Sequence, residues 1–253
     1  MKNNLSEKII IYGILLLWTF ICLFPIYWTA TTSFKTAASV TQGLLIPWID
    51  FEPSWKGWRN LGFSPDTLFV ESNPREEFLA RFFNTAFISA SASALAVILG
   101  SFAAYGLSRF NYKFGFMRNP DISFFFLSQL ILPPVVLALP VLVLYRELDL
   151  LDTHIGMILI YTLTVLPIVL PGIASAFILC LILCWNEYFL AALITSTDAK
   201  TMPVMVASQI SSQSIKWWNM AAISAALCLP LIIVAIFLER YIVKGMAAGA
   251  IKG

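Results

Sequence analysis

Long apolar runs separated by short charged stretches dominate the chain and predict membrane-spanning helices. Four runs have roughly the 20 residues that one helix needs to cross a bilayer, at 9–30, 82–107, 122–145 and 217–238. A fifth run, 155–194, is about twice that length. One helix would leave half of this run over, and two helices would follow each other without a polar loop. The fifth run is therefore the anomaly in the pattern.

Small residues and prolines distinguish two of the predicted spans. The span 82–107 has Ala, Ser and Gly at intervals of three and four, which lets helix backbones approach closely in lipid, so we predict a central place for it in the bundle. The span 122–145 carries Pro133, Pro134 and Pro140. We predict that this span is kinked or broken, with its freed carbonyls facing protein or water.

A polar segment, 31–81, separates the first two spans and is too long for a turn and too irregular for a span. We interpret it as a folded aqueous loop. Trp48, Trp55 and Trp58 are expected at the membrane interface, where amphipathic rings prefer to lie. The sequence thus divides into the tail and first helix (1–30), an extracytoplasmic loop (31–81) and a transmembrane core (82–253).

Composition supports a membrane protein, because 59% of the residues are hydrophobic and only 12% are charged, against about 25% charged in soluble domains. A net charge of +2 is too small to indicate a nucleic-acid partner. The four cysteines lie inside apolar runs, and only Glu187 stands near Cys180 and Cys184. We therefore predict no metal site and no cofactor bound by this chain.

The distribution of charge predicts the topology. The N-terminus, the loop 109–118 and the C-terminal tail are basic, whereas 31–81 and 146–154 hold most of the acids. The positive-inside rule then places both termini in the cytoplasm, so the number of crossings is even and six are expected. The fifth run must supply two of them, but the 12 residues 155–166 are too few to cross at 1.5 Å per residue. The fourth span is therefore incomplete.

The polar residues of the sequence predict a transport protein and not an enzyme. The sequence has no phosphate-binding loop of the usual pattern, and His154 has no His or Cys partner. Glu187 is the one charged side chain of the fifth run, where burial in lipid costs on the order of 3 kcal/mol. It either lines a path or pairs across helices, or it anchors a helix end at the membrane boundary. Candidate path residues are Asn84, Gln129, Asn186, Glu187 and Tyr188.

Four stretches resemble a known family: Ala104 to Phe110, Trp185 to Tyr188, Thr201 to Val204, and the C-terminal stretch 239–253. The last of these ends in Met246-Ala247-Ala248-Gly249-Ala250-Ile251-Lys252-Gly253. They resemble, in order along the chain, the permease subunits of bacterial carbohydrate ABC importers of the maltose-transport, MalG-like class. The fold implied is all-α, a six-helix polytopic type I permease.

The resemblance implies a subunit that imports a sugar, sugar alcohol or glycoside by alternating access across the bacterial cytoplasmic membrane. The implied partners are a second homologous permease, two cytoplasmic ATPases that hold ATP and Mg, an extracytoplasmic substrate-binding protein and the lipid bilayer. Candidate ATPase-facing residues are Arg109, Lys113, Arg118, Lys244 and Lys252. The remaining alternative is a stand-alone carrier or channel.

The sequence departs from the family between the fourth and fifth spans. Family members have a cytoplasmic coupling loop there, whose short helix docks on the ATPase, and near 166–171 this loop is missing. Either the natural protein has residues that this sequence lacks, or the chain is a deleted, uncoupled remnant. No coupling residue is assigned.

Overall fold

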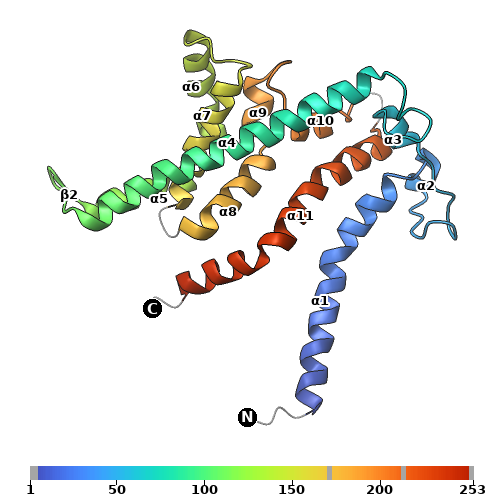
Figure 1. Ribbon diagram of the computed structural model, residues 1–253, viewed down its shortest axis with the longest axis horizontal. Coiled ribbons are helices and arrows are strands. Elements are labelled where there is room, and N and C mark those ends of the chain that lie inside the picture. The colour runs from blue at the N-terminus through green and yellow to red at the C-terminus, as the bar shows by residue number, and fades with distance from the viewer. Residues whose placement is uncertain (1–4, 170–172, 212–214, 251–253) are drawn as a thin grey trace. The chain divides into compact units, whose positions relative to one another are not determined.

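The computed structural model describes residues 5–169, 173–211 and 215–250 (Figure 1). The chain divides into two units. The first comprises Met1–Glu76 and Val206–Cys228, and the second comprises Glu77–Met205 and Leu229–Gly253. The residues of helices α4 and α11 are divided between the two units.

The first unit begins with α1 (Leu5–Thr32), an apolar helix that confirms the first predicted span. Its 28 residues extend about 42 Å at 1.5 Å per residue, enough to cross a hydrocarbon core of about 30 Å. None of its most apolar window is buried by the rest of the chain. Lipid or another subunit must therefore cover these side chains, because water would not stabilise such a surface.

The segment after α1 is folded, as predicted, and holds α2 (Ala37–Thr41) and α3 (Lys56–Asn60). The Thr36 hydroxyl accepts a hydrogen bond from the Ser39 amide and caps α2. Trp48 is 83% exposed, whereas the Trp58 indole donates to the Ser33 hydroxyl at 3.3 Å. Trp58 is thus tied to Ser33, and the membrane-interface position stays a prediction for all three tryptophans.

The second unit is built on α4 (Asn73–Arg109), which contains the predicted span 82–107 (Figure 1). The helix begins at Asn73, within the stretch predicted as a loop, so the last part of that stretch is helical and its extracytoplasmic position stays a prediction. Pro74 is tolerated in its first turn, and polar residues such as Glu76 and Glu77 form helical turns beyond the apolar part. Polarity alone had suggested a loop there.

The face of α4 with small residues is buried, which confirms its predicted central place. The buried positions are Thr85, Ile88, Ser89, Ala92, Ser93, Ala96 and Gly100. This face packs in one core with α7 (His154–Val165) and α8 (Ile173–Trp185). The Thr162 hydroxyl of α7 lies 3.4 Å from the Ala92 carbonyl, so the two backbones approach closely, as small residues allow.

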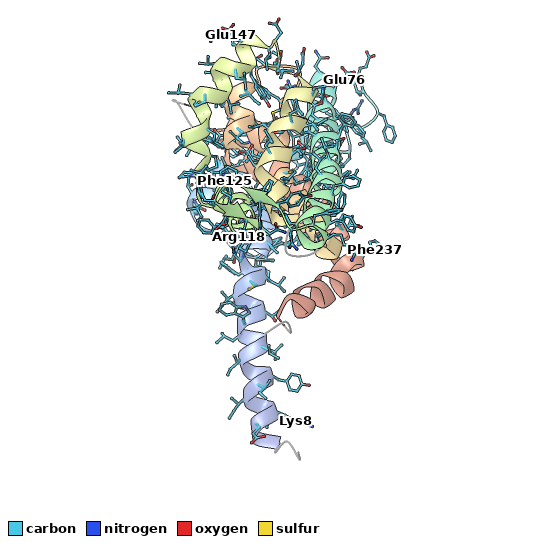
Figure 2. The ribbon with its side chains drawn as sticks, turned by 90° about the vertical axis from the view of Figure 1, so that its left-hand side faces the viewer. Lys8, Glu76, Arg118, Phe125, Glu147 and Phe237 are labelled. Carbon is cyan, nitrogen blue, oxygen red and sulfur yellow. The ribbon has the colours of Figure 1, made fainter. Side chains whose placement is uncertain are left out.

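The predicted third span is broken, as its prolines indicated. It consists of α5 (Asn119–Ser128), a 3₁₀ turn η1 (Gln129–Ile131) and α6 (Pro134–Glu147), with an angle of 93° between the two helices. A short antiparallel hairpin of β1 (Lys113–Phe114) and β2 (Met117–Arg118) leads from α4 into α5. Figure 2 shows Arg118 and Glu147 far apart, near the start of α5 and at the end of α6.

The long fifth run forms short helices. After α7 come a 3₁₀ turn η2 (Leu166–Val169), α8 and α9 (Phe189–Ile194), so the fifth span does not continue unbroken to Ile194. The expected turn near 167–171 falls partly on 170–172, which lie outside the described residues.

Six crossing helices are not confirmed. Three helices of the described chain are long and apolar enough to cross, or four if the bent pair α5–α6 counts as one. The third of them is α11 (Trp217–Ala250), which is longer than the predicted span 217–238 and contains Pro230. A short helix α10 (Met202–Ala207) precedes it.

Candidate functional site

The tetrapeptide Trp185 to Tyr188 forms a break between α8 and α9. The Glu187 carboxylate accepts hydrogen bonds from the Leu190 amide at 2.8 Å and the Ala191 amide at 3.2 Å. The Asn186 side chain donates to the Ile182 carbonyl at 2.8 Å. Both side chains thus satisfy backbone groups that the break would leave without partners, which is what a helix interruption at membrane depth requires.

Two neighbouring helices support this break. Tyr161 of α7 is 1% exposed, and its hydroxyl donates to the Glu187 backbone carbonyl at 3.2 Å. The Trp185 ring meets the Phe82 ring of α4 edge to face, with centroids 5.9 Å apart. The sequence reasoning missed Tyr161, although a tyrosine inside an apolar helix must find a partner for its hydroxyl.

The Glu187 carboxylate makes no ion pair with a described lysine or arginine. Its observed partners are the first amides of its own following helix. Of the two interpretations drawn from the sequence, the geometry supports the helix anchor, and lining of a path stays a prediction.

A second polar cluster, here called the loop clamp, comprises Asp152, Arg81, Asn84, His154 and the loop 195–200. The Asp152 carboxylate accepts six hydrogen bonds of 2.7 to 3.1 Å from the backbone amides of residues 196–199 and from the hydroxyls of Ser196 and Thr197. Burial alone would raise the pKa of Asp152, but these hydrogen bonds hold it well below its usual range.

Two residues of α4 also bind the same loop, and His154 of α7 contacts one of them. Arg81 donates to the Thr197 carbonyl, and the Asn84 amide donates to the carbonyls of Asp198 at 2.7 Å and Lys200 at 2.9 Å. The Asn84 carbonyl oxygen lies 2.8 Å from the His154 Nε2 atom. His154 thus has a partner that the search for His or Cys neighbours could not reveal.

The five candidate path residues lie at three separate places. Asn186, Glu187 and Tyr188 form the α8–α9 break, Asn84 belongs to the loop clamp, and Gln129 lies in η1 at the bend between α5 and α6. The Gln129 side chain donates to the Phe125 carbonyl at 3.3 Å. The described hydrogen bonds do not join these places into one polar site.

The candidate ATPase-facing residues gather mainly at the hairpin. Arg109 ends α4, and Lys113 and Arg118 are direct partners across the two strands. The Asn119 amide donates to the carbonyls of Leu107 and Phe110 at 2.7 and 2.6 Å, which ties the hairpin to the end of α4. Lys244 belongs to α11, and Lys252 lies outside the described residues. Within the described parts of the chain, no group of His, Cys, Asp and Glu is placed to hold a metal ion.

Known proteins resemble the chain along its whole length, although no family model matches it. It is 29% identical to the trehalose/maltose transport system permease protein MalG of Thermococcus litoralis, covering all of both chains. It is 26% identical to the inner membrane ABC transporter permease protein YcjP of Escherichia coli, covering all of this chain and 99% of the relative. The chain is a full-length homologue of carbohydrate ABC importer permeases.

The fold of the permease agrees with this sequence similarity. A crystal structure of a bacterial ABC transporter that imports the acidic polysaccharide alginate matches 95% of this chain with a TM-score of 0.63 at 19% identity. The resemblance to a carbohydrate importer permease is confirmed, and with it the all-α permease fold and a role in transport and not in catalysis. The chain is a multi-pass inner-membrane protein.

The alignments are longer than the permease itself. The alignment with the Thermococcus protein runs over 289 positions and that with the Escherichia coli protein over 294, whereas this chain has 253 residues. The relatives therefore carry residues that have no counterpart here.

Proposed function

We propose that the permease pairs with a second homologous permease to move a sugar, sugar alcohol or glycoside inward. Two cytoplasmic ATPases would drive the pair, an extracytoplasmic protein would deliver the substrate, and both termini would face the cytoplasm. The observation that carries the proposal is the similarity over the full length to importer permeases, one named for trehalose and maltose. A second relative, from Mycobacterium tuberculosis, is named for trehalose and is 26% identical over 91% of this chain.

We infer that the two helix interruptions contribute to the substrate path. Transporters commonly build such paths from broken helices, whose exposed backbone groups bind polar cargo. In this chain the bend at Gln129 and the break at Asn186 are both interruptions of apolar helices. A hydroxyl-rich sugar needs hydrogen-bond donors and acceptors there, and amide and phenol side chains provide them.

ATP-dependent uptake tests this function. The permease would be reconstituted with a candidate second permease, an ATPase and a binding protein from the same organism, and uptake of labelled trehalose and maltose into proteoliposomes would be measured with and without ATP. We expect uptake that requires ATP and the binding protein. Uptake by this chain alone, abolished in Glu187→Gln but not in the control Glu147→Gln, would instead establish the stand-alone carrier.

A specific observation also favours the uncoupled remnant. Seven residues separate Val165 of α7 from Ile173 of α8, and four of them form η2. A docking helix of even two turns would need about seven residues by itself, besides the turns that flank it. The connection therefore has no room for such a helix.

Restoring the connection distinguishes the remnant from a coupled permease. The segment of the Escherichia coli relative that joins the corresponding helices would be inserted between Leu166 and Pro171. If the chain is an uncoupled remnant, we expect ATP-dependent uptake only with the insertion. Equal uptake with and without the inserted segment would refute the remnant.

A further inference from the structure

The β1–β2 hairpin places two cations opposite each other without an acid between them. Lys113 and Arg118 are direct cross-strand partners, so their side chains leave the same face of the hairpin. Neither has an ion-pair partner within the described chain. Like charges in this position destabilise a strand pair, so the arrangement is favourable only when an anion compensates it.

The nearby carboxylate makes no ion pair with either cation. Asp121, three residues beyond Arg118, uses its Oδ2 atom to accept the Arg118 backbone amide at 2.8 Å and so caps the start of α5. Arg109 adds another cation at the end of α4. The segment 109–121 therefore carries three cations and one acid.

The two cations line a hollow of about 460 Å³, together with Asn111, Tyr112, Asn119 and Pro120. The hollow is fixed by Asn119, whose Oδ1 atom accepts the Tyr112 amide at 2.8 Å while its amide group donates to the end of α4. An arginine fork and a lysine ammonium beside such a hollow suit a phosphate group.

The surroundings of the hollow are apolar and exposed. Gly115, with φ of +60°, makes the tight turn of the hairpin and puts Phe116 at its tip, 94% exposed. Phe110 and Phe124 beside it are also exposed. The hairpin lies where the apolar helix α4 ends and α5 begins, and exposed aromatic rings in such a place lie in the interface between headgroups and acyl chains.

We propose that the hairpin binds the phosphate of an anionic phospholipid between Lys113 and Arg118, with Phe116 inserted among the neighbouring lipids. The charge of the headgroup removes the repulsion between the two cations. This site depends on α4 crossing the membrane and not on which substrate the permease carries. Bound anionic lipid would hold the end of α4 and the start of the bent pair α5–α6 at a fixed depth.

The test compares bilayers of different charge. The full chain would be placed in nanodiscs of phosphatidylcholine, with or without phosphatidylglycerol, and its thermal unfolding followed by tryptophan fluorescence. We expect phosphatidylglycerol to raise the unfolding temperature of the wild type. The double variant Lys113→Gln/Arg118→Gln should lose this rise, whereas the control Arg146→Gln, in the last turn of α6, should keep it.

The difference in unfolding temperature between the double variant and the wild type should change sign between the two bilayers, which distinguishes lipid binding from a structural role. Because the two cations repel each other, the double variant should unfold at the same or a higher temperature than the wild type in phosphatidylcholine, and at a lower one with phosphatidylglycerol. A variant that simply folds badly would be less stable in both bilayers, and that result would overturn the proposal.

Two further outcomes would identify another occupant of the site. Inorganic phosphate added to the detergent-solubilised chain should not reproduce the rise, and if it does, the ligand is free phosphate and not a lipid. If instead both variants respond equally to phosphatidylglycerol but the double variant no longer co-purifies with an ATPase, the cations contact a protein, and the lipid site is refuted.

Discussion

The Asp152 carboxylate should determine the order of the loop 195–200. In Asp152→Asn, the Oδ1 atom can still accept the amides of Ser196 and Ala199. The new NH₂ group replaces an oxygen that accepts four hydrogen bonds from Ser196, Thr197 and Asp198. The NH₂ group cannot accept from the backbone amides of Thr197 and Asp198, so these two bonds are lost and the loop must open there. The Ser196 and Thr197 hydroxyls can turn and accept from it instead.

The structure sets the size of this effect. A hydrogen bond to a charged group contributes about 1.5–3 kcal/mol, but the two lost bonds share one atom and their contributions do not add. Asp152 is also only half-buried, so water can replace part of what is lost. We therefore expect about 2 kcal/mol of destabilisation, or roughly 4–8 °C in unfolding temperature for a chain of this size.

A neighbouring aspartate provides the control. Asp149 and Asp152 have nearly equal positive φ angles of 53° and 55°, a region that asparagine tolerates as well as aspartate does. The exposed Asp149 side chain makes no hydrogen bond within the described chain. Asp149→Asn thus removes the same charge at nearly the same backbone conformation. The difference in stability between the two variants therefore measures the contribution of the loop clamp.

Two assays report the result. Thermal unfolding in detergent measures the stability, and hydrogen exchange of the amides of residues 196–199 measures the local order. Exchange at these amides should accelerate in Asp152→Asn and remain unchanged in Asp149→Asn. If the two variants unfold at the same temperature and exchange alike, the carboxylate does not hold the loop and the reasoning is wrong.

The low pKa of Asp152 also predicts a dependence on pH. Since the folded pKa lies below the unfolded value of about 3.9, the stabilisation is fully present above that value. It is lost progressively as the pH falls below about 4 towards the folded pKa. The wild type and Asp152→Asn should therefore converge in stability on acidification from pH 5 to pH 3, and a constant difference would contradict the assigned cause.

Three other substitutions test the packing. Glu187→Ala removes the carboxylate that caps α9 and should cost about 1 kcal/mol in thermal unfolding, whereas Glu187→Gln, which keeps an acceptor, should cost less. Ala92→Leu enlarges a fully buried residue between α4 and α7 and should cost about 1–3 kcal/mol, and no loss would mean that this face is not packed. Lys35→Met removes a buried ammonium group that has no hydrogen-bond partner and lies 3.7 Å from the Trp28 ring centre. Since burial lowers the Lys35 pKa, the charged form is disfavoured in the fold, so this variant should gain stability relative to the wild type as the pH falls from 10.5 towards the folded pKa, and keep that gain at lower pH.

Features encoded by local pattern could be predicted from the sequence. Small residues at intervals of three and four in the span 82–107 predicted close helix packing, because packing in lipid depends on side-chain size at fixed intervals, and Ser89, Ala92 and Ser93 of this run are buried. Pro133 and Pro134 located the bend between α5 and α6, because proline removes a backbone donor and blocks the preceding turn. Both features depend on residues that lie close together in the sequence.

The loop clamp could not be predicted in the same way. Asp152 and Ser196 are 44 positions apart in the sequence, and their contact exists only because α7 and α9 are packed in one core. Asn84 was selected for its polar group inside an apolar run, but which partner it meets depends on where the loop 195–200 lies. Polarity identified residues that need partners, and only the tertiary structure determines which partners they have.

Helix α7 and the connection that follows it are too short to cross a membrane of ordinary thickness. Its 12 residues rise about 18 Å, and the four residues of η2 add about 8 Å, which together fall short of a hydrocarbon core of about 30 Å. The 13 residues of α8 rise only about 20 Å before the break at Glu187. The membrane must therefore thin around this pair, or neighbouring protein must cover the polar ends. If the partner ATPases act on this chain, we expect the hairpin and α11 to be their contacts, because the described part of the connection between α7 and α8 is only the four residues of η2.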